Sequence, residues 1–161
     1  MTSNSAKTRH VAFVIYPDIV LLDLVGPLQV FSHALDPETG APGYTCHVVS
    51  ASGTMTQTNT VLPIPSQRIE SVADLNIHTV VFVGGDGANR AMLDDGLIAQ
   101  IRMLTRHAHR VASVCSGALV MAATGLLDGR RAVTHWDDCE TLAKCFPKVR
   151  VEMDPIYIKD G

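Results

Sequence analysis

The chain has 161 residues, of which 47% are hydrophobic and 18% charged, and its formal net charge is −3. This length suits one domain with a core of its own. The apolar fraction excludes an intrinsically disordered chain, and the negative balance gives the chain as a whole no electrostatic footprint for nucleic acid. No apolar run approaches the length of a membrane helix, so we expect no membrane partner.

The start of the chain is polar and lacks the apolar segment of a signal peptide. We therefore expect a disordered tail over residues 1–9 and a single domain over residues 10–161. The four cysteines form no C-x-x-C pair and show no metal-ligand spacing with histidine. This pattern predicts a reduced, cytoplasmic setting, and we expect neither a metal nor a cofactor.

Apolar runs alternate with segments of helical spacing along the chain. Runs such as VAFVIY and TVVFV lack the polar alternation of a half-exposed strand, which indicates strands covered on both faces. In chain order, the predicted elements are strand 11–16, helix 22–35, strand 44–50, a helical turn at 71–75, strand 79–83, helix 88–107, strand 110–114, helix 116–127, strand 131–134, helix 137–146, and short strands at 149–151 and 156–158.

Three of the predicted helices have distinctive features. Pro27 is expected in the first turn of helix 22–35, where its missing N–H costs little. Helix 88–107 has a continuous set of apolar residues at helical spacing, although Gly96 lowers the helix propensity of this segment. Helix 116–127 is apolar on nearly all sides, which predicts a central, buried helix.

Strands that alternate with helices predict right-handed crossovers and a mostly parallel sheet with helices on both faces. The expected fold is therefore a three-layer α/β/α sandwich with a flavodoxin-like sheet. Asp160-Gly161 is a turn dipeptide that normally leads into another strand. We accordingly expect the given sequence to stop inside a longer protein.

Cys115 stands between a predicted strand and a predicted helix, in the segment SVCSG at 113–117. Small residues two positions before and after a nucleophile are typical of a nucleophile elbow, whose tight turn projects the side chain from the strand end. The first N–H groups of the following helix would then face the sulfur and lower the pKa of the thiol. The alternative is a buried cysteine with a packing role only.

Two further segments follow predicted strands. In VGGDG at 83–87, the glycines Gly84, Gly85 and Gly87 would let the backbone approach a ligand and present N–H groups, as an oxyanion loop does; a plain tight turn is the alternative. Asp23 follows the first strand in an apolar surround. It is either the cap of the next helix or an acid with a raised pKa that bonds the cysteine sulfur.

Asp23, the glycine loop and Cys115 each follow the carboxyl end of a predicted parallel strand, and ligands bind at that edge in open α/β sheets. We therefore expect one crevice, with Cys115 and Asp23 as catalytic candidates and the glycine loop with Ser116 as the ligand-binding part. His135, after a later strand, is a further catalytic candidate as a base or hydrogen-bond partner. A core histidine packed beside Trp136 fits the sequence equally well.

A family resemblance rests on four segments: LDLVGPLQVF at 22–31, SVCSGA at 113–118, GLLDGRRA at 125–132 and THW at 134–136. Together they resemble the ThiJ/PfpI superfamily, and most of all the amidase-like N-terminal domains of AraC-type transcriptional regulators. The resemblance implies an effector-sensing domain that binds a small metabolite at Cys115. It also implies that the C-terminal strand and helices of the fold are missing from the sequence. It further implies a homodimer, and DNA contact only through a C-terminal helix-turn-helix domain absent from the sequence.

Isonitrile hydratases are similar in the first three of these segments. The resemblance implies that Cys115 and Asp23 are catalytic in an enzyme of that type, whereas the position of Ser116 is commonly threonine there. A stand-alone cysteine-dependent hydratase or amidase is therefore the alternative function. Peptidase-like members place a histidine directly after the cysteine, and Ser116 in its place counts against a protease.

Overall fold

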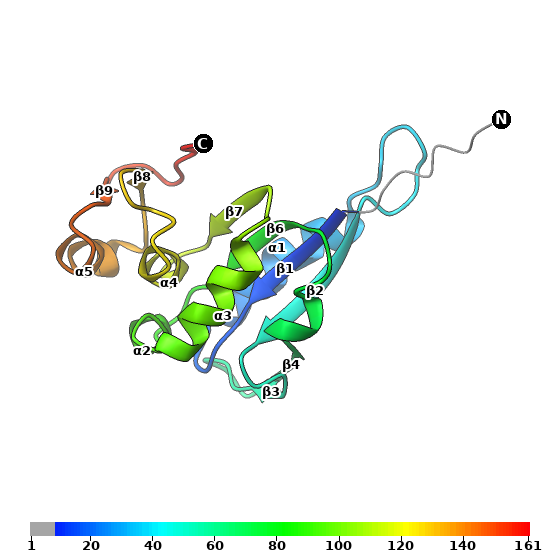
Figure 1. Cartoon of the computed structure of the whole chain (residues 1–161), viewed down its shortest axis with the longest axis horizontal. Coiled ribbons are helices and arrows are strands. Elements are labelled where there is room, and N and C mark those ends of the chain that lie inside the picture. The colour runs from blue at the N-terminus through cyan, green and yellow to red at the C-terminus, as the bar shows by residue number, and fades with distance from the viewer. Residues whose placement is uncertain (1–8) are drawn as a thin grey trace.

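Five parallel strands form the central sheet of the computed structural model, which describes residues 9–161 (Figure 1). Val11 to Ile15 are fully buried at the centre of the sheet, which explains the unbroken apolar run there. The sheet order is β5-β2-β1-β6-β7. Its strands are β1 (Arg9–Val14), β2 (Tyr44–Ser50), β5 (Gln67–Arg68), β6 (Ile77–Phe82) and β7 (Arg110–Ser113).

Helices cover both faces of this sheet, since Figure 1 shows α3 in front of it and α1 behind it. On the α1 side, the ring of Phe31 packs edge-on between Phe13 and Tyr44, at centroid distances of 6.1 and 4.9 Å. The predicted three-layer α/β/α class is confirmed. The helices are α1 (Leu21–His33), α2 (Ala88–Ala91), α3 (Asp95–Thr105), α4 (Gly117–Ala123) and α5 (Cys139–Cys145).

Short strand pairs lie outside the central sheet. An antiparallel pair joins β3 (Met55–Thr56) to β4 (Ile64–Pro65), and a parallel pair joins β8 (Arg131–Ala132) to β9 (Arg150–Val151). The predicted strand at 156–158 is wrong. Ile156 and Tyr157 are exposed and pair with no strand in the part of the chain that the structure describes.

The start of the first helix differs from the prediction. Because α1 already begins at Leu21, Pro27 lies inside the helix and not in its first turn. Proline has no N–H, so the carbonyl of Asp23 loses its usual helical partner. Val20 is the N-cap residue, and the interpretation of Asp23 as a cap is therefore wrong.

The predicted helix 88–107 is divided into α2 and α3. The side chain of Asp94 accepts a hydrogen bond from the N–H of Leu97 at 3.0 Å and caps a new helix. The predicted helix 116–127 ends at Ala123, shortly before Gly125 with its φ of 86°, but its burial is confirmed for every residue from Gly117 to Ala122.

Residues 1–8 of the expected tail lie outside the described residues, and Arg9, which we assigned to it, begins β1. Within residues 9–161, no helix is both long and apolar enough to cross a membrane.

Two pairs of histidines lie on or beside the strands of the sheet. His10 Nδ1 lies 3.0 Å from His47 Nε2, and the ring of His78 stacks on that of His109 with 4.9 Å between centroids. Burial lowers the pKa values of His47 and His78, and the charges of the neighbouring histidines lower both further. The folded state therefore resists protonation that the unfolded chain accepts near pH 6.5.

We expect the free energy of unfolding to fall as the pH drops through 6.5 toward the lower folded pKa values, because the unfolded state binds more protons in that window. Urea unfolding at pH 7.5 and pH 5.5 measures this loss. The His47→Gln/His78→Gln double variant should lose less over the same interval. His33→Gln, on the exposed face of α1, is the matched control. If the free energy of unfolding of the double variant falls with pH as steeply as that of His33→Gln, the prediction is contradicted.

Candidate functional site at the carboxyl edge of the sheet

Cys115 occupies a strained turn between β7 and α4. Its φ is 53°, and Asp18 is the only other residue besides glycine with a positive φ within residues 9–161. Such a left-handed backbone is costly for a residue with a Cβ, so the surrounding packing must hold it. A Cβ on Gly117 would lie 2.8 Å from the carbonyl carbon of Phe82, which explains the small residue there. The predicted elbow geometry is confirmed.

Gly84 lies between Asp23 and Cys115. A Cβ on Gly84 would stand 2.7 Å from Asp23 Oδ2, 2.7 Å from the Cβ of Cys115 and 2.7 Å from the carbonyl oxygen of Val114. Real Cβ atoms do not approach other atoms this closely, so only glycine fits. The end of β6 thus brings together the acid after β1 and the cysteine after β7, as the sheet-edge argument predicted.

Asp23 is an acid in a poorly solvated place. Its Oδ2 atom is buried and has no hydrogen-bond partner among residues 9–161. Burial raises the pKa of the Asp23 carboxyl, while the Cys115 thiol, a potential donor to the carboxylate, and the charge of His135 offset part of the rise. The raised pKa agrees with the second interpretation of Asp23 made from the sequence.

The pKa of the Cys115 thiol is raised, whereas the sequence predicted that it would be lowered. Burial raises it most, and the negative charge of Asp23 adds to this. The backbone N–H and the hydroxyl of Ser116 lower it, but they do not outweigh burial. The sulfur at rest is therefore a thiol, and a base must remove its proton before it attacks.

The Ser116 side chain holds the glycine loop in place. Its Oγ accepts a hydrogen bond from the N–H of Gly85 at 2.7 Å and donates one to the Gly85 carbonyl at 3.0 Å. The Gly85 N–H is thus already paired and does not point to a ligand. Gly87 packs against Pro17, because a Cβ on Gly87 would lie 3.0 Å from the Pro17 carbonyl carbon.

The segment after β8 reaches the site. The hydroxyl of Thr134 donates to the carbonyl of Cys115 at 3.0 Å and ties the elbow to this segment. His135 is near enough for its charge to lower the pKa of Asp23. Its Nδ1, however, accepts from the N–H of Asp137 at 3.3 Å, and its ring packs on Trp136 at 4.0 Å between centroids. No hydrogen bond joins His135 to Cys115 within residues 9–161.

Sequence reasoning missed Tyr16. Its buried hydroxyl donates a hydrogen bond to the carbonyl of Val83, directly before Gly84. Burial raises its pKa, and the charges of Cys115 and Asp23 raise it further. The available signal was a tyrosine at the end of a buried strand, where a polar group needs a partner.

Fold and site together define a class: a parallel α/β domain with a cysteine elbow, a buried acid and a close-packed glycine loop at one sheet edge. A model of the DJ-1/PfpI family matches residues 9–153, and the chain belongs to this family. The predicted ThiJ/PfpI relationship is confirmed.

Curated relatives have more than one function. The chain is 38% identical over 143 residues to an uncharacterized protein in the cpoL 5′ region of Streptomyces lividans, covering 89% of this chain and 99% of that protein. It is 32% identical to isonitrile hydratase of Pseudomonas putida, covering 90% of this chain and 61% of the hydratase. It is 26% identical to the HTH-type transcriptional regulator GlxA of Rhizobium meliloti, covering 91% of this chain but only 44% of the regulator.

Solved structures show the same fold. A ThiJ/PfpI family protein from Pseudomonas syringae superposes with a TM-score of 0.79 at 26% identity, over 96% of this chain and 60% of that one.

Proposed function

We propose that the chain is the effector-sensing domain of an AraC-type transcriptional regulator and binds a small metabolite in the crevice at Cys115. The observation that carries this is the buried, unpartnered Oδ2 of Asp23 beside the cysteine. A buried acceptor without a donor costs free energy, and a ligand with an N–H group would supply the donor. The similarity to GlxA supports the regulator class.

In this function, ligand binding favours one of two conformations and so alters DNA binding. The match covers only 44% of the GlxA regulator, and we assign DNA contact to the remaining part of the regulator, which this chain does not span. We also propose a cytoplasmic homodimer. Exposed Leu22 of α1 and exposed Val61 and Leu62 offer an apolar surface for a second copy, and the bond from the Leu21 N–H to Asn59 Oδ1 ties the two segments together.

The effector proposal is tested with a panel of small amines and primary amides. We expect at least one compound to raise the melting temperature of the chain and to protect Cys115 from iodoacetamide. Asp23→Ala should abolish both effects, because it removes the acceptor. Asp86→Ala is the matched control, since Asp86 is an exposed acid in the glycine loop. Equal stabilisation of Asp23→Ala would reject Asp23 as the ligand contact.

A second candidate function is isonitrile hydration. The raised pKa of Asp23 next to a protonated thiol favours it, because a carboxylate with a raised pKa is a better base for the thiol proton. Asp23 would take the thiol proton as the sulfur of Cys115 attacks the isonitrile carbon and would return it to that carbon, giving a thioimidate. Addition of water and loss of the thiol then yield an N-substituted formamide. The 32% identity to isonitrile hydratase supports this candidate.

A further inference from the structure

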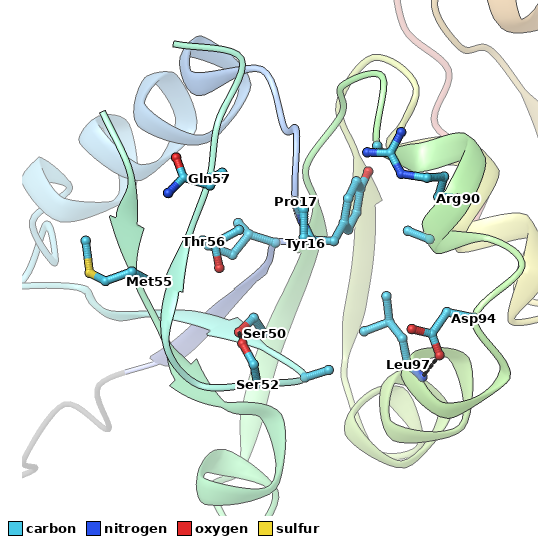
Figure 2. A pocket seen from close by; sticks show the side chains of 14 residues that line it. Tyr16, Pro17, Ser50, Ser52, Met55, Thr56, Gln57, Arg90, Asp94 and Leu97 are labelled. Atoms are coloured by element: carbon cyan, nitrogen blue, oxygen red, sulfur yellow. Dashed lines mark hydrogen bonds between the residues drawn. The ribbon is translucent and has the colours of Figure 1, made fainter. Parts of the chain in front are cut away.

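A pocket next to the Cys115 site opens at the same edge of the sheet, and Tyr16 and Gly87 border both. Its volume is about 400 Å³, within the range of small-molecule sites. Figure 2 shows it between the β3 strand on one side and α2 with α3 on the other. Asp23, Gly84 and Cys115 do not line it. The strand order reverses between β1 and β6, and the pocket lies where such a reversal places ligands.

The floor of the pocket is apolar. Ile15 and Pro17 come from the end of β1, Ala51 follows β2, and Ala91 and Leu97 belong to α2 and α3. These side chains present hydrocarbon to the cavity from three directions. Burial of a ligand's apolar body against them removes hydrocarbon surface from water, which is the main favourable contribution to binding.

One charged group of the lining is paired, since Arg90 forms an ion pair with Asp18. The carboxylate of Asp94 accepts from the N–H of Leu97 in the cap of α3 but has no ion-pair partner within residues 9–161. A negatively charged ligand would be repelled by this carboxylate and would find no free cation in the lining. The lining thus disfavours an anionic ligand.

Two polar side chains of the lining, Thr56 and Gln57, make no hydrogen bond within residues 9–161. Gln57 is exposed, whereas Thr56 of β3 is only 4% exposed. Figure 2 places Thr56 on the strand side of the pocket, beside Gln57. A hydroxyl both donates and accepts, so it can bond either kind of polar group on a ligand.

We propose that this pocket is a second binding site, for a small molecule without negative charge that has an apolar body and one hydrogen-bonding group that meets Thr56. Its occupant would not contact Cys115, because the cysteine is not part of the lining.

Two dyes with the same body test the proposal on the purified chain. N-phenyl-1-naphthylamine is uncharged and carries one N–H, whereas 1-anilinonaphthalene-8-sulfonate adds a negative charge. We expect saturable, one-site fluorescence enhancement with the uncharged dye and binding weaker by about tenfold or more with the sulfonate. Equal or tighter binding of the sulfonate would overturn the assignment of a ligand without negative charge.

Variants locate the dye. Ser52→Phe places a ring at the pocket wall and should abolish binding, while Thr54→Phe, in the same exposed loop but outside the lining, should leave it unchanged. In the unsubstituted protein, the methyl NMR signals of Ala91 and Leu97 should shift on addition of dye, and those of Leu142 in α5 should not. Binding that survives Ser52→Phe, or dye binding without shifts at Ala91 and Leu97, would overturn the proposal, as would the absence of saturable binding.

Discussion

Gly87→Ala is expected to destabilise the domain by about 3 kcal/mol or more, at the upper end of what overpacking costs. A Cβ at this position would lie 3.0 Å from the carbonyl carbon of Pro17 and 3.2 Å from Cδ2 of Tyr16. The Pro17 backbone follows the buried end of β1, and the Gly87 N–H donates to the carbonyl of Asp18 at 3.2 Å. Neither the turn after β1 nor the loop at Gly87 can move away without breaking this hydrogen bond. Urea unfolding measures the loss.

Gly26→Ala is the matched control. The φ of Gly87 is −62°, so alanine there meets a steric obstacle and not a forbidden backbone. Gly26 lies within α1, and a Cβ on it would meet no atom within 4 Å, so alanine there should stabilise by about 0.5–1 kcal/mol. A loss below about 1 kcal/mol for Gly87→Ala would show that the turn after β1 yields easily.

Asp23→Asn is expected to change two properties of Cys115 in opposite directions. Removal of the negative charge lowers the raised pKa of the thiol, so alkylation by iodoacetamide at pH 7.5 should become several-fold faster. If the chain is a hydratase, loss of the proton carrier should slow formamide production from an alkyl isonitrile by about 100-fold or more. Mass spectrometry of the Cys115 peptide and NMR of the product give the two rates.

Cysteine variants provide the controls for this experiment. Cys115→Ser should abolish formamide production, while Cys145→Ser, at the exposed end of α5, should leave it unchanged. Slower alkylation of Asp23→Asn would contradict the assigned charge effect. No product from the unsubstituted protein would reject the hydratase function, and the sensing function would then be the one to pursue.

The strand and helix order could be predicted from the sequence because a strand buried on both faces has a continuous run of apolar residues. The run VAFVIY needs no partner to be identified as a central strand, and β2 has the predicted bounds, Tyr44–Ser50. Small residues around Cys115 likewise indicated the elbow that its φ of 53° confirms. The shared sheet edge then followed from the parallel topology alone.

The sequence prediction was wrong where a local contact or cap overrides the periodic pattern of apolar residues. The cap by Asp94 divides one predicted helix into two, and the early start of α1 moves Pro27 into the helix. Isolated apolar residues such as Ile156 indicate a strand only when a neighbouring strand is available. The Asp94 cap, the early start of α1 and the lack of a neighbouring strand at Ile156 leave the apolar pattern unchanged, and the prediction relied on that pattern.

The family, the α/β class and the convergence of Asp23, Gly84 and Cys115 at one edge could be inferred from sequence patterns. The direction of the shift in the thiol pKa follows only from the folded arrangement, because burial and the charge of Asp23 come from segments distant in sequence. The folded arrangement also decides that the Gly85 N–H is occupied by Ser116, 31 residues away. Local patterns record which residues are apolar, whereas desolvation and hydrogen-bond pairing depend on which segments meet in space.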